Sequence, residues 1–317
     1  MPLPILVLAA LLATAPGTRS PGPARHVPPP TAAVERPAIA FTFDDGFDPR
    51  VDPNAPRDNA ALLAHLKQAG VTAMLFPTGR AIRSDSGLAL CADWAKAGHP
   101  IGNHTWSHRG LDQPDVGPAR FAEDVLHADS VLRSLPTFER RLRFPYLKEG
   151  RDAATRDGFR AWMRTHGYAS APVSVDASDW YYDSRWRALS KAGRDADLPR
   201  LRDAYVEHLW NRACYYDSLA RATTGRGPRH VLLLHANAIN AACLGDVIAR
   251  FRGRGWAIVS PAEAFADPLY AQQPSALPAG ESIVWALARS HGAAGLRYPG
   301  EDARYERPLL APLGLDE

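Results

Sequence analysis

Apolar and polar positions alternate along most of the chain in two different rhythms. Short runs rich in β-branched and aromatic residues are typical of strands, whereas apolar residues three or four positions apart are typical of helices. The clearest helical stretches cover 57–70, 118–135 and 151–167. The strand candidates cover 38–43, 71–76, 100–103, 141–144, 173–176, 230–234 and 256–259. This alternation predicts an α/β fold with parallel strands, because parallel neighbours need long crossover connections.

Polar residues follow several of these strands at the point where the strand ends. They are Asp44, Asp45, His104, His108, Tyr146, Asp179 and His235. The alternation of strands and helices alone fits either a barrel or a doubly wound sheet. Functional groups that gather from the carboxyl ends of several strands are typical of the mouth of a barrel. We therefore predict a distorted (β/α) barrel with about seven parallel strands.

The stretch TFDDG (42–46) ends the first strand with two adjacent carboxylates. Side chains of successive strand residues point to opposite faces, so Asp44 and Asp45 converge only if the strand ends there, and Gly46 permits the turn. Two close carboxylates raise one of their pKa values unless a cation lies between them. One interpretation makes one aspartate a metal ligand and the other a base, but the motif taken alone favours an ordinary Asp-Asp-Gly turn.

Histidines and an arginine follow the next strands. His104 and His108 are four residues apart, and two imidazoles with one carboxylate are a common site for zinc. In RFPY (143–146), Arg143 suits a two-pronged hydrogen bond to a carboxylate, and Pro145 leaves the Tyr146 N–H free to point into a site. Surface histidines and a surface arginine beside a proline turn are the alternatives.

Two further stretches add acid–base and aromatic groups. VDASDWYYD (175–183) offers Asp179, which could orient a histidine, beside aromatic rings that could stack on sugars. HVLLLHAN (230–237) is an apolar strand that ends at His235. The alternatives are an aromatic rim that only packs and a core histidine.

Composition excludes some classes of protein. The chain has 317 residues with 46% hydrophobic residues and a net charge of +3, so it can bury a sizeable core and has no electrostatic bias toward nucleic acid or an anionic membrane. The three cysteines, Cys91, Cys214 and Cys243, lack CxxC spacing. They are expected to be buried thiols, with one disulfide as the alternative. No HExxH motif occurs, which argues against a zinc protease.

Four segments are predicted. An apolar, signal-like segment covers 1–15 and a proline-rich linker covers 16–37. The barrel domain covers 38–268 with an insertion at about 184–224, and the tail at 269–317 has no assigned role. The apolar start favours export, to the periplasm or outside the cell. No cysteine follows it to carry a lipid, so the only anchor considered is an uncleaved N-terminal segment.

Five motifs in series resemble the polysaccharide deacetylases, carbohydrate esterase family 4, with its NodB-like domain. They are TFDDG (42–46), HTWSH (104–108), RFPY (143–146), DASDW (176–180) and LLLH (232–235). The resemblance spans roughly 37–265 and implies a distorted barrel. It also implies that Asp45, His104 and His108 hold a divalent metal, zinc or cobalt, that Asp44 is the general base and that His235 is the general acid.

The resemblance implies supporting roles as well. Arg143 would pair with Asp44, Asp179 would orient His235, and the Tyr146 N–H would help to hold the oxyanion. Substrate contacts would come from Trp106, Tyr146, Trp180 and Leu233.

The implied reaction removes acetate from N-acetylated sugars of a chitin-like or peptidoglycan-like glycan. An O-deacetylase acting on a polysaccharide such as xylan and a non-catalytic sugar-binding module are the alternatives. Three features depart from the common family pattern: Phe47 after Asp-Asp-Gly, the late Gly150 after RFPY, and the insertion. All three lie where the substrate would bind, so they affect which substrate is expected and not which reaction.

Overall fold

The computed structural model describes residues 36–316. The predicted signal-like segment and nearly all of the predicted linker lie outside this range. Seven strands form one sheet in which every pair is parallel: β1 (Ala38–Asp45), β2 (Met74–Pro77), β3 (Ile101–Asn103), β4 (Phe138–Leu142), β5 (Ala169–Ser170), β6 (Arg229–His235) and β7 (Ala257–Ile258). The strand order is β5-β4-β3-β2-β1-β6, and β7 pairs with the first residues of β1. The predicted parallel α/β fold is confirmed.

The sheet curls because one segment contacts both of its ends. Ala171, directly after β5, donates its N–H to Leu142 O of β4 at 2.8 Å. Four residues later, Val175 forms a parallel bridge to Leu232 of β6. The result is a half-barrel rather than a flat sheet. The strand predicted at 173–176 is wrong in detail, since this segment makes only that bridge and the fifth strand lies at 169–170.

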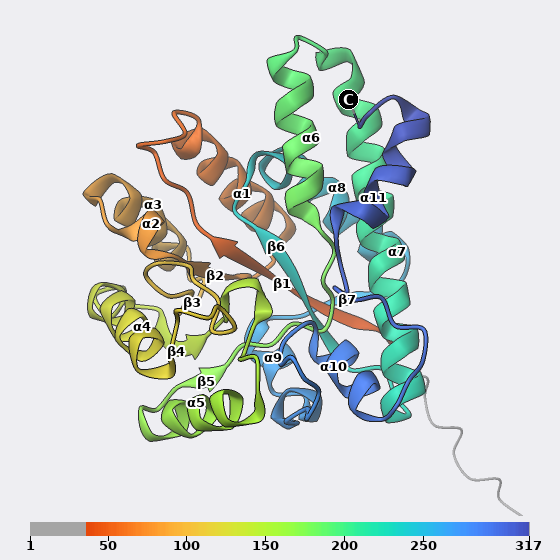
Figure 1. Cartoon of the computed structure of the whole chain (residues 1–317). Coiled ribbons are helices and arrows are strands. Elements are labelled where there is room, and N and C mark those ends of the chain that lie inside the picture. Colours follow the sequence, from red (N-terminus) through yellow and green to blue (C-terminus); the bar gives the residue numbers. More distant parts are fainter. Residues whose placement is uncertain (1–35, 317) are drawn as a thin grey trace, which may run out of the picture. The chain divides into compact units, whose positions relative to one another are not determined.

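Helices surround the curled sheet (Figure 1). They are α1 (Ala55–Ala69), α2 (Gly79–Ile82), α3 (Asp85–Lys96), α4 (Pro118–Leu132), α5 (Ala153–Thr165), α6 (Asp179–Lys191), α7 (Leu198–Thr224), α8 (Ala238–Gly253), α9 (Pro261–Phe265), α10 (Ile283–Ser290) and α11 (Ala303–Leu310). Their ends follow local rules: α4 begins at Pro118, and α1 stops at Gly70, whose φ of 61° is the left-handed conformation that glycine adopts readily.

The core lies between the central strand and the helices. Phe41 and Phe43 of β1 are fully buried. Their rings lie 6.0 Å from that of Phe251 in α8 and 5.4 Å from that of Trp94 in α3, respectively. The three cysteines are free; Cys91 and Cys243 are buried as expected, and Cys214 is half-buried. Burying β1 on all sides fixes its carboxyl end, where Asp44 and Asp45 stand.

The tail folds back onto the rest of the domain. Ala279 forms an antiparallel bridge with Gly150, the late glycine of the loop after RFPY. Further along, the guanidinium groups of Arg194 and Arg200 donate to the carbonyls of Gly314 and Leu313 at 2.8 and 2.9 Å. In Figure 1, α11 lies beside α6 and α7. The predicted insertion is therefore helical and supports the chain end.

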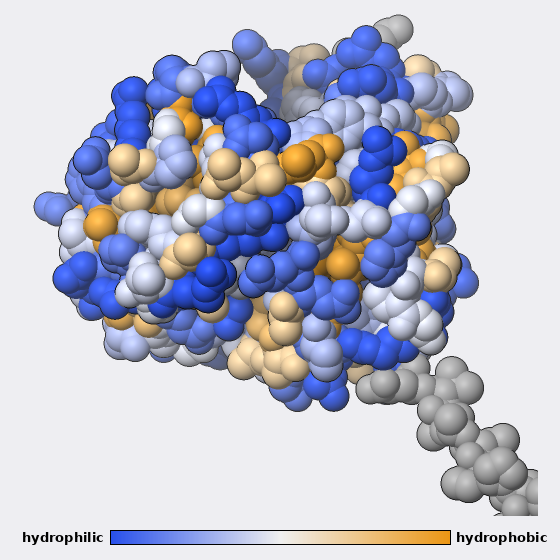
Figure 2. All heavy atoms as spheres, turned by 60° about the horizontal axis from the view of Figure 1, so that its bottom comes forward, coloured by the Kyte–Doolittle hydropathy of each residue, from blue (hydrophilic) through white to orange (hydrophobic). Residues whose placement is uncertain are grey.

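The surface is mixed in character. On the face shown in Figure 2, hydrophilic residues predominate and hydrophobic residues occur in small, scattered groups. Within 36–316, no helix is both long and apolar enough to cross a membrane.

Candidate active site

A pocket of about 1020 Å³ opens at the carboxyl ends of the strands. Most of the predicted site residues line it together: Asp44, Asp45, His104, Trp106, His108, Tyr146, Trp180, Leu233 and His235. The other two predicted residues, Arg143 and Asp179, are buried and lie behind this lining. The predicted site residues thus lie together in the fold, although they come from five separate stretches of the sequence.

Asp45, His104 and His108, hereafter the pocket triad, bring one potential ligand atom each to within 4.8 Å of one another. Oδ1 of Asp45 lies 3.8 Å from His104 Nε2 and 3.5 Å from His108 Nε2. His104 Nδ1 donates to Arg143 O at 2.8 Å, so the lone pair of Nε2 faces the carboxylate. Burial lowers the pKa of both histidines, which keeps the imidazoles neutral. Two neutral imidazoles and a carboxylate fit a zinc-type ion.

The backbone of this site is unusual. Asp45, Thr105, His108 and Tyr146 have φ values of 72°, 67°, 55° and 55°. Left-handed conformations of residues other than glycine cost about 1–3 kcal/mol each and persist only where surrounding contacts enforce them. One such contact is the Thr78 N–H, which donates to Asp45 O at 3.0 Å. The strain is concentrated where side chains must converge on one point.

Asp44 lies deeper than Asp45 and is only 2% exposed. Its Oδ1 has no hydrogen-bond partner, and its Oδ2 lies 3.6 Å from His104 Nε2. Burial raises the pKa of Asp44 to about 7, even though the positive charge of Arg143 acts in the opposite direction. A buried carboxylate with a free oxygen and a pKa near neutrality suits a general base.

Arg143 departs from the two-pronged geometry that the sequence suggested. Its Nη1 lies 3.9 Å from Asp44 Oδ2, an ion pair without a hydrogen bond. Its Nη2 donates instead to Thr42 Oγ1 at 2.9 Å, and the guanidinium lies 4.7 Å from the centre of the Phe76 ring. Arg143 therefore acts on Asp44 through its charge rather than through a fixed fork.

Asp179 and His235 form a tight pair. Asp179 Oδ1 lies 2.6 Å from His235 Nδ1, and Oδ2 accepts the His235 backbone N–H at 2.7 Å. Burial works against a charged imidazole, but the Asp179 carboxylate outweighs it and raises the pKa of His235 to about 10. Asn237 and Asn240 also donate to Asp179, at 3.1 and 2.7 Å. Sequence reasoning missed both asparagines, although their three-residue spacing at a helix start is a capping pattern.

Aromatic residues border the pocket. Tyr146 and Trp180 are 60% and 47% exposed, and the Tyr146 ring lies 4.7 Å from that of His108. Trp106 stacks on His127 at 3.8 Å, while Leu233 is buried. Exposed flat rings beside polar groups are suited to sugar faces, and the oxyanion role of the Tyr146 N–H stays a prediction.

The tail, to which the sequence gave no role, supplies part of the pocket wall. Glu281, Pro299 and Glu301 all line the pocket. Glu281 is paired with Lys148 of the loop after RFPY. In the sequence, only the acidic residues of this otherwise mixed segment indicated that the tail contributes to the pocket.

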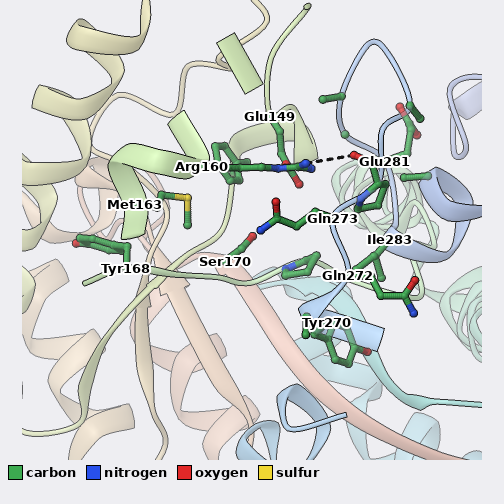
Figure 3. Close-up of a pocket in the computed structure, with 18 of the residues that line it drawn as sticks. Glu149, Arg160, Met163, Tyr168, Ser170, Tyr270, Gln272, Gln273, Glu281 and Ile283 are labelled. Carbon is green, nitrogen blue, oxygen red and sulfur yellow. Dashed lines mark hydrogen bonds and ion pairs between the residues drawn. The ribbon is translucent and has the colours of Figure 1, made fainter. Parts of the chain in front are cut away.

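Glu281 also lines a second, smaller pocket of about 210 Å³ between α5 and the tail. Figure 3 shows the Arg160 side chain directed toward Glu149 there; the two groups are 2.7 Å apart. Arg160 also donates to Pro274 O at 3.2 Å. None of the predicted site residues lines this pocket. The contacts of Arg160 there connect the tail to α5.

A second cluster of possible metal ligands extends from Glu301, in the wall of the main pocket, into the interior. His208, Glu301 and Glu306, hereafter the buried cluster, also bring one ligand atom each to within 4.8 Å of one another. Arg212 pairs with Glu301, and the Tyr216 hydroxyl donates to the same carboxylate at 2.9 Å. This cluster therefore contains its own cation.

The curled parallel sheet, with carboxylates and imidazoles at the carboxyl ends of its strands, defines an α/β half-barrel with a candidate metal-binding active site. A family model for polysaccharide deacetylases matches residues 31–168. The peptidoglycan-N-acetylglucosamine deacetylase of Bacillus cereus is 27% identical over 143 residues, which are 45% of this chain and 46% of that protein. Residues 31–168, less than half of this chain, are thus similar to polysaccharide deacetylases, in agreement with the resemblance of the five motifs. The match spans less than half of that relative's length.

Solved structures agree with the fold. Peptidoglycan deacetylase PdaC from Bacillus subtilis has 19% identity and a TM-score of 0.50, over 73% of this chain and 90% of its own. A mutant of a carbohydrate esterase family 4 pseudoenzyme, with restored enzymatic activity, has 14% identity and a TM-score of 0.51, over 73% and 68% of the two chains. At these identities the likeness concerns the fold alone.

Proposed function

We propose that this protein is a metal-dependent deacetylase that removes acetyl groups from N-acetylated sugars of a polysaccharide. The observation that carries the proposal is the separation of roles within one pocket. The pocket contains a triad of two imidazoles and a carboxylate, a buried carboxylate with a free oxygen, and a histidine held by a further carboxylate. Hydrolysis of an amide needs these three parts: an electrophile site, a base and an acid.

The pocket triad would hold the metal, and zinc is the ion that its donor set suits best. A bound ion of this kind polarises a carbonyl and acidifies a coordinated water. Asp44 would accept the proton of the attacking water, and its raised pKa of about 7 makes it a stronger base than an exposed aspartate. Arg143 would stabilise the ionised carboxylate through its charge at 3.9 Å.

His235 would protonate the leaving group. An amine leaves poorly unless it receives a proton, and a pKa of about 10 keeps His235 in its acid form. Asp179 would hold the imidazole so that Nε2 points away from the carboxylate, toward substrate. This strongly protonated acid favours an N-acetyl over an O-acetyl substrate.

The substrate class is a peptidoglycan-like or chitin-like glycan. The name of the Bacillus cereus relative supports the first, and the exposed rings of Tyr146 and Trp180 at the pocket border support a sugar in general. We also propose that the protein works outside the cytoplasm, on the basis of the apolar segment at 1–15.

Acetate release from matched oligosaccharides tests the proposal. N-acetylglucosamine oligomers, peptidoglycan fragments and acetylated xylan would be compared with protein that has been chelated and then restored with zinc or cobalt. We expect release from the N-acetylated substrates only after metal is restored. Release from xylan alone would establish the O-deacetylase. Binding of oligomers without release by metal-loaded protein would establish a sugar-binding module.

A further inference from the structure

The turn that carries Asp179, residues 176–179, is held from behind by residues far along the chain. We call this segment the acid turn. His208 Nε2, in the middle of α7, donates to Ala177 O at 2.8 Å. The other ring nitrogen, Nδ1, lies 3.3 Å from Glu306 Oε2 in α11. A continuous set of contacts thus runs from the last helix, through α7, to the acid turn.

His208 Nδ1 and the Glu306 carboxylate face each other inside the protein. Since Nε2 donates to a carbonyl, Nδ1 faces the carboxylate with a lone pair unless a proton lies between them. Burial lowers the pKa of His208 to about 4 and raises the pKa of Glu306 to about 7. Glu306 on one side and the hydrogen bond to Ala177 O on the other hold the ring, so that its Nε2–H stays directed at Ala177 O.

The tail also holds the helix that begins at the acid turn. The Tyr181 hydroxyl donates to Asp316, and Arg185 donates to Asp316 O at 2.8 Å. Both donors belong to the first two turns of α6, whose first residue is Asp179. The chain end therefore contacts α6 on the turn that follows the acid–base pair.

The acid turn needs such support. Ser178 has φ 47° and ψ 35°, a left-handed conformation that residues other than glycine seldom adopt, and no side chain caps the start of α6. Such a conformation persists only where surrounding contacts enforce it. Asp179 stands on the next residue, and the orientation of His235 depends on it.

We propose that His208 and Glu306 are positioning residues for the general acid, so that the C-terminal segment completes the active site. The inference rests on the proposed deacetylase function for its role and on the structure for its geometry. Loss of the His208 N–H would loosen the acid turn and misalign Asp179 with His235. Proton delivery to the leaving group would then slow, while metal and substrate binding would not change.

The test compares two variants at one position. His208→Leu removes the donor to Ala177 O, whereas His208→Gln keeps an N–H near the position of Nε2. We expect kcat on N-acetylglucosamine oligomers to fall at least about tenfold in His208→Leu, because misplacing a reacting group by about 1 Å can cost ~100-fold. KM and zinc content should stay within twofold of wild type, and His208→Gln should recover most of kcat.

His230→Leu is the matched control. His230 is also a buried histidine beside a carboxylate of α7, with Nε2 3.2 Å from Asp217 Oδ1. Its side chain does not contact the acid turn, so we expect unchanged kcat even if its melting temperature falls. An equal loss of kcat in this control would overturn the proposal. If His208→Leu does not fold, Glu306→Gln replaces it, with a several-fold loss of kcat expected.

A spectroscopic signature separates this inference from the proposed function. The 2.6 Å contact between Asp179 and His235 predicts a strongly deshielded Nδ1 proton in the NMR spectrum of histidine-labelled protein. That resonance should shift or broaden in His208→Leu and stay in place in His230→Leu. If wild-type protein releases no acetate but the resonance still shifts in His208→Leu alone, the deacetylase function is refuted and the positioning role of His208 is supported. A resonance and a kcat that both match wild type in His208→Leu would refute the inference.

Discussion

The protein contains two groups of histidine and carboxylate that look alike and are expected to behave differently. The pocket triad and the buried cluster each bring three possible ligand atoms to within 4.8 Å. In both, one ring nitrogen of a histidine is tied to a backbone carbonyl at 2.8 Å, His104 to Arg143 O and His208 to Ala177 O. In both, the other nitrogen faces carboxylates.

The two groups differ in how their negative charge is neutralised. In the pocket triad the Asp45 and His108 side chains are 43% and 28% exposed, and no lysine or arginine among the described residues is paired with Asp45. The side chains of the buried cluster are at most 5% exposed, although Glu301 also lines the main pocket, and Arg212 pairs with Glu301. A group that is open and lacks a cation can take one from solution, whereas a group that contains its own cation stabilises structure. We therefore expect metal only at the pocket triad.

The largest expected loss of activity comes from replacing Asp44, the proposed base beside the pocket triad. Asp44→Asn removes the proton acceptor but keeps the volume of the buried side chain. Loss of a general base typically costs 10²–10⁴-fold, so acetate release should fall about 1,000-fold while zinc remains bound. Initial rates and zinc content on the same sample check both halves. Activity within tenfold of wild type would remove Asp44 from the base role.

Metal binding is the next test of the comparison. His104→Ala should weaken zinc binding by more than the ~10–100-fold that loss of an outer partner of a ligand costs, because it removes a ligand itself. Glu306→Gln, in the buried cluster, should leave zinc binding unchanged. Zinc titration of the chelated proteins measures both. Loss of zinc in the Glu306 variant instead would reverse the assignment of the two groups.

Stability should respond to pH through the buried cluster. Burial raises the pKa of Glu301 to about 8, far above that of an exposed glutamate. The folded state therefore keeps this proton to a higher pH than the unfolded chain does. The stabilising contribution is complete below about pH 4.5 and is lost as the pH rises toward 8. The free energy of unfolding should fall by about 1–3 kcal/mol from pH 5 to 8.

Glu301→Gln isolates this contribution, because the amide does not titrate. The slope of the unfolding free energy against pH, from urea denaturation, should be flatter in the variant than in wild type. Identical slopes would show that Glu301 ionises normally, and that the cluster is more open than its burial indicates.

Much of the fold and the pocket could be predicted from the sequence because the signals are local. A strand followed directly by polar residues and a turn, as at Asp44–Gly46, marks the carboxyl end of a strand, and the topology then brings such ends together. The buried cluster had no such signal. Glu306 meets His208 through contacts across about a third of the chain, and neither residue stands in a periodic or motif-like context. The strand expected at 173–176 failed for a related reason: its residues were apolar enough, but only one of them pairs, with β6.

The smallest expected change in activity comes from replacing Trp180, at the border of the pocket that contains the pocket triad. Trp180 is 47% exposed and lines the pocket beside the acid pair, so its ring can contact a sugar without touching the reacting atoms. Trp180→Ala should raise KM several-fold, equivalent to about 1 kcal/mol, and leave kcat unchanged, because the lost contact is the same in the ground and transition states. Leu126→Ala, which shortens a 39% exposed side chain on α4 away from the pocket, is the control. A fall in kcat with constant KM would instead show that Trp180 acts on the acid turn rather than on substrate binding.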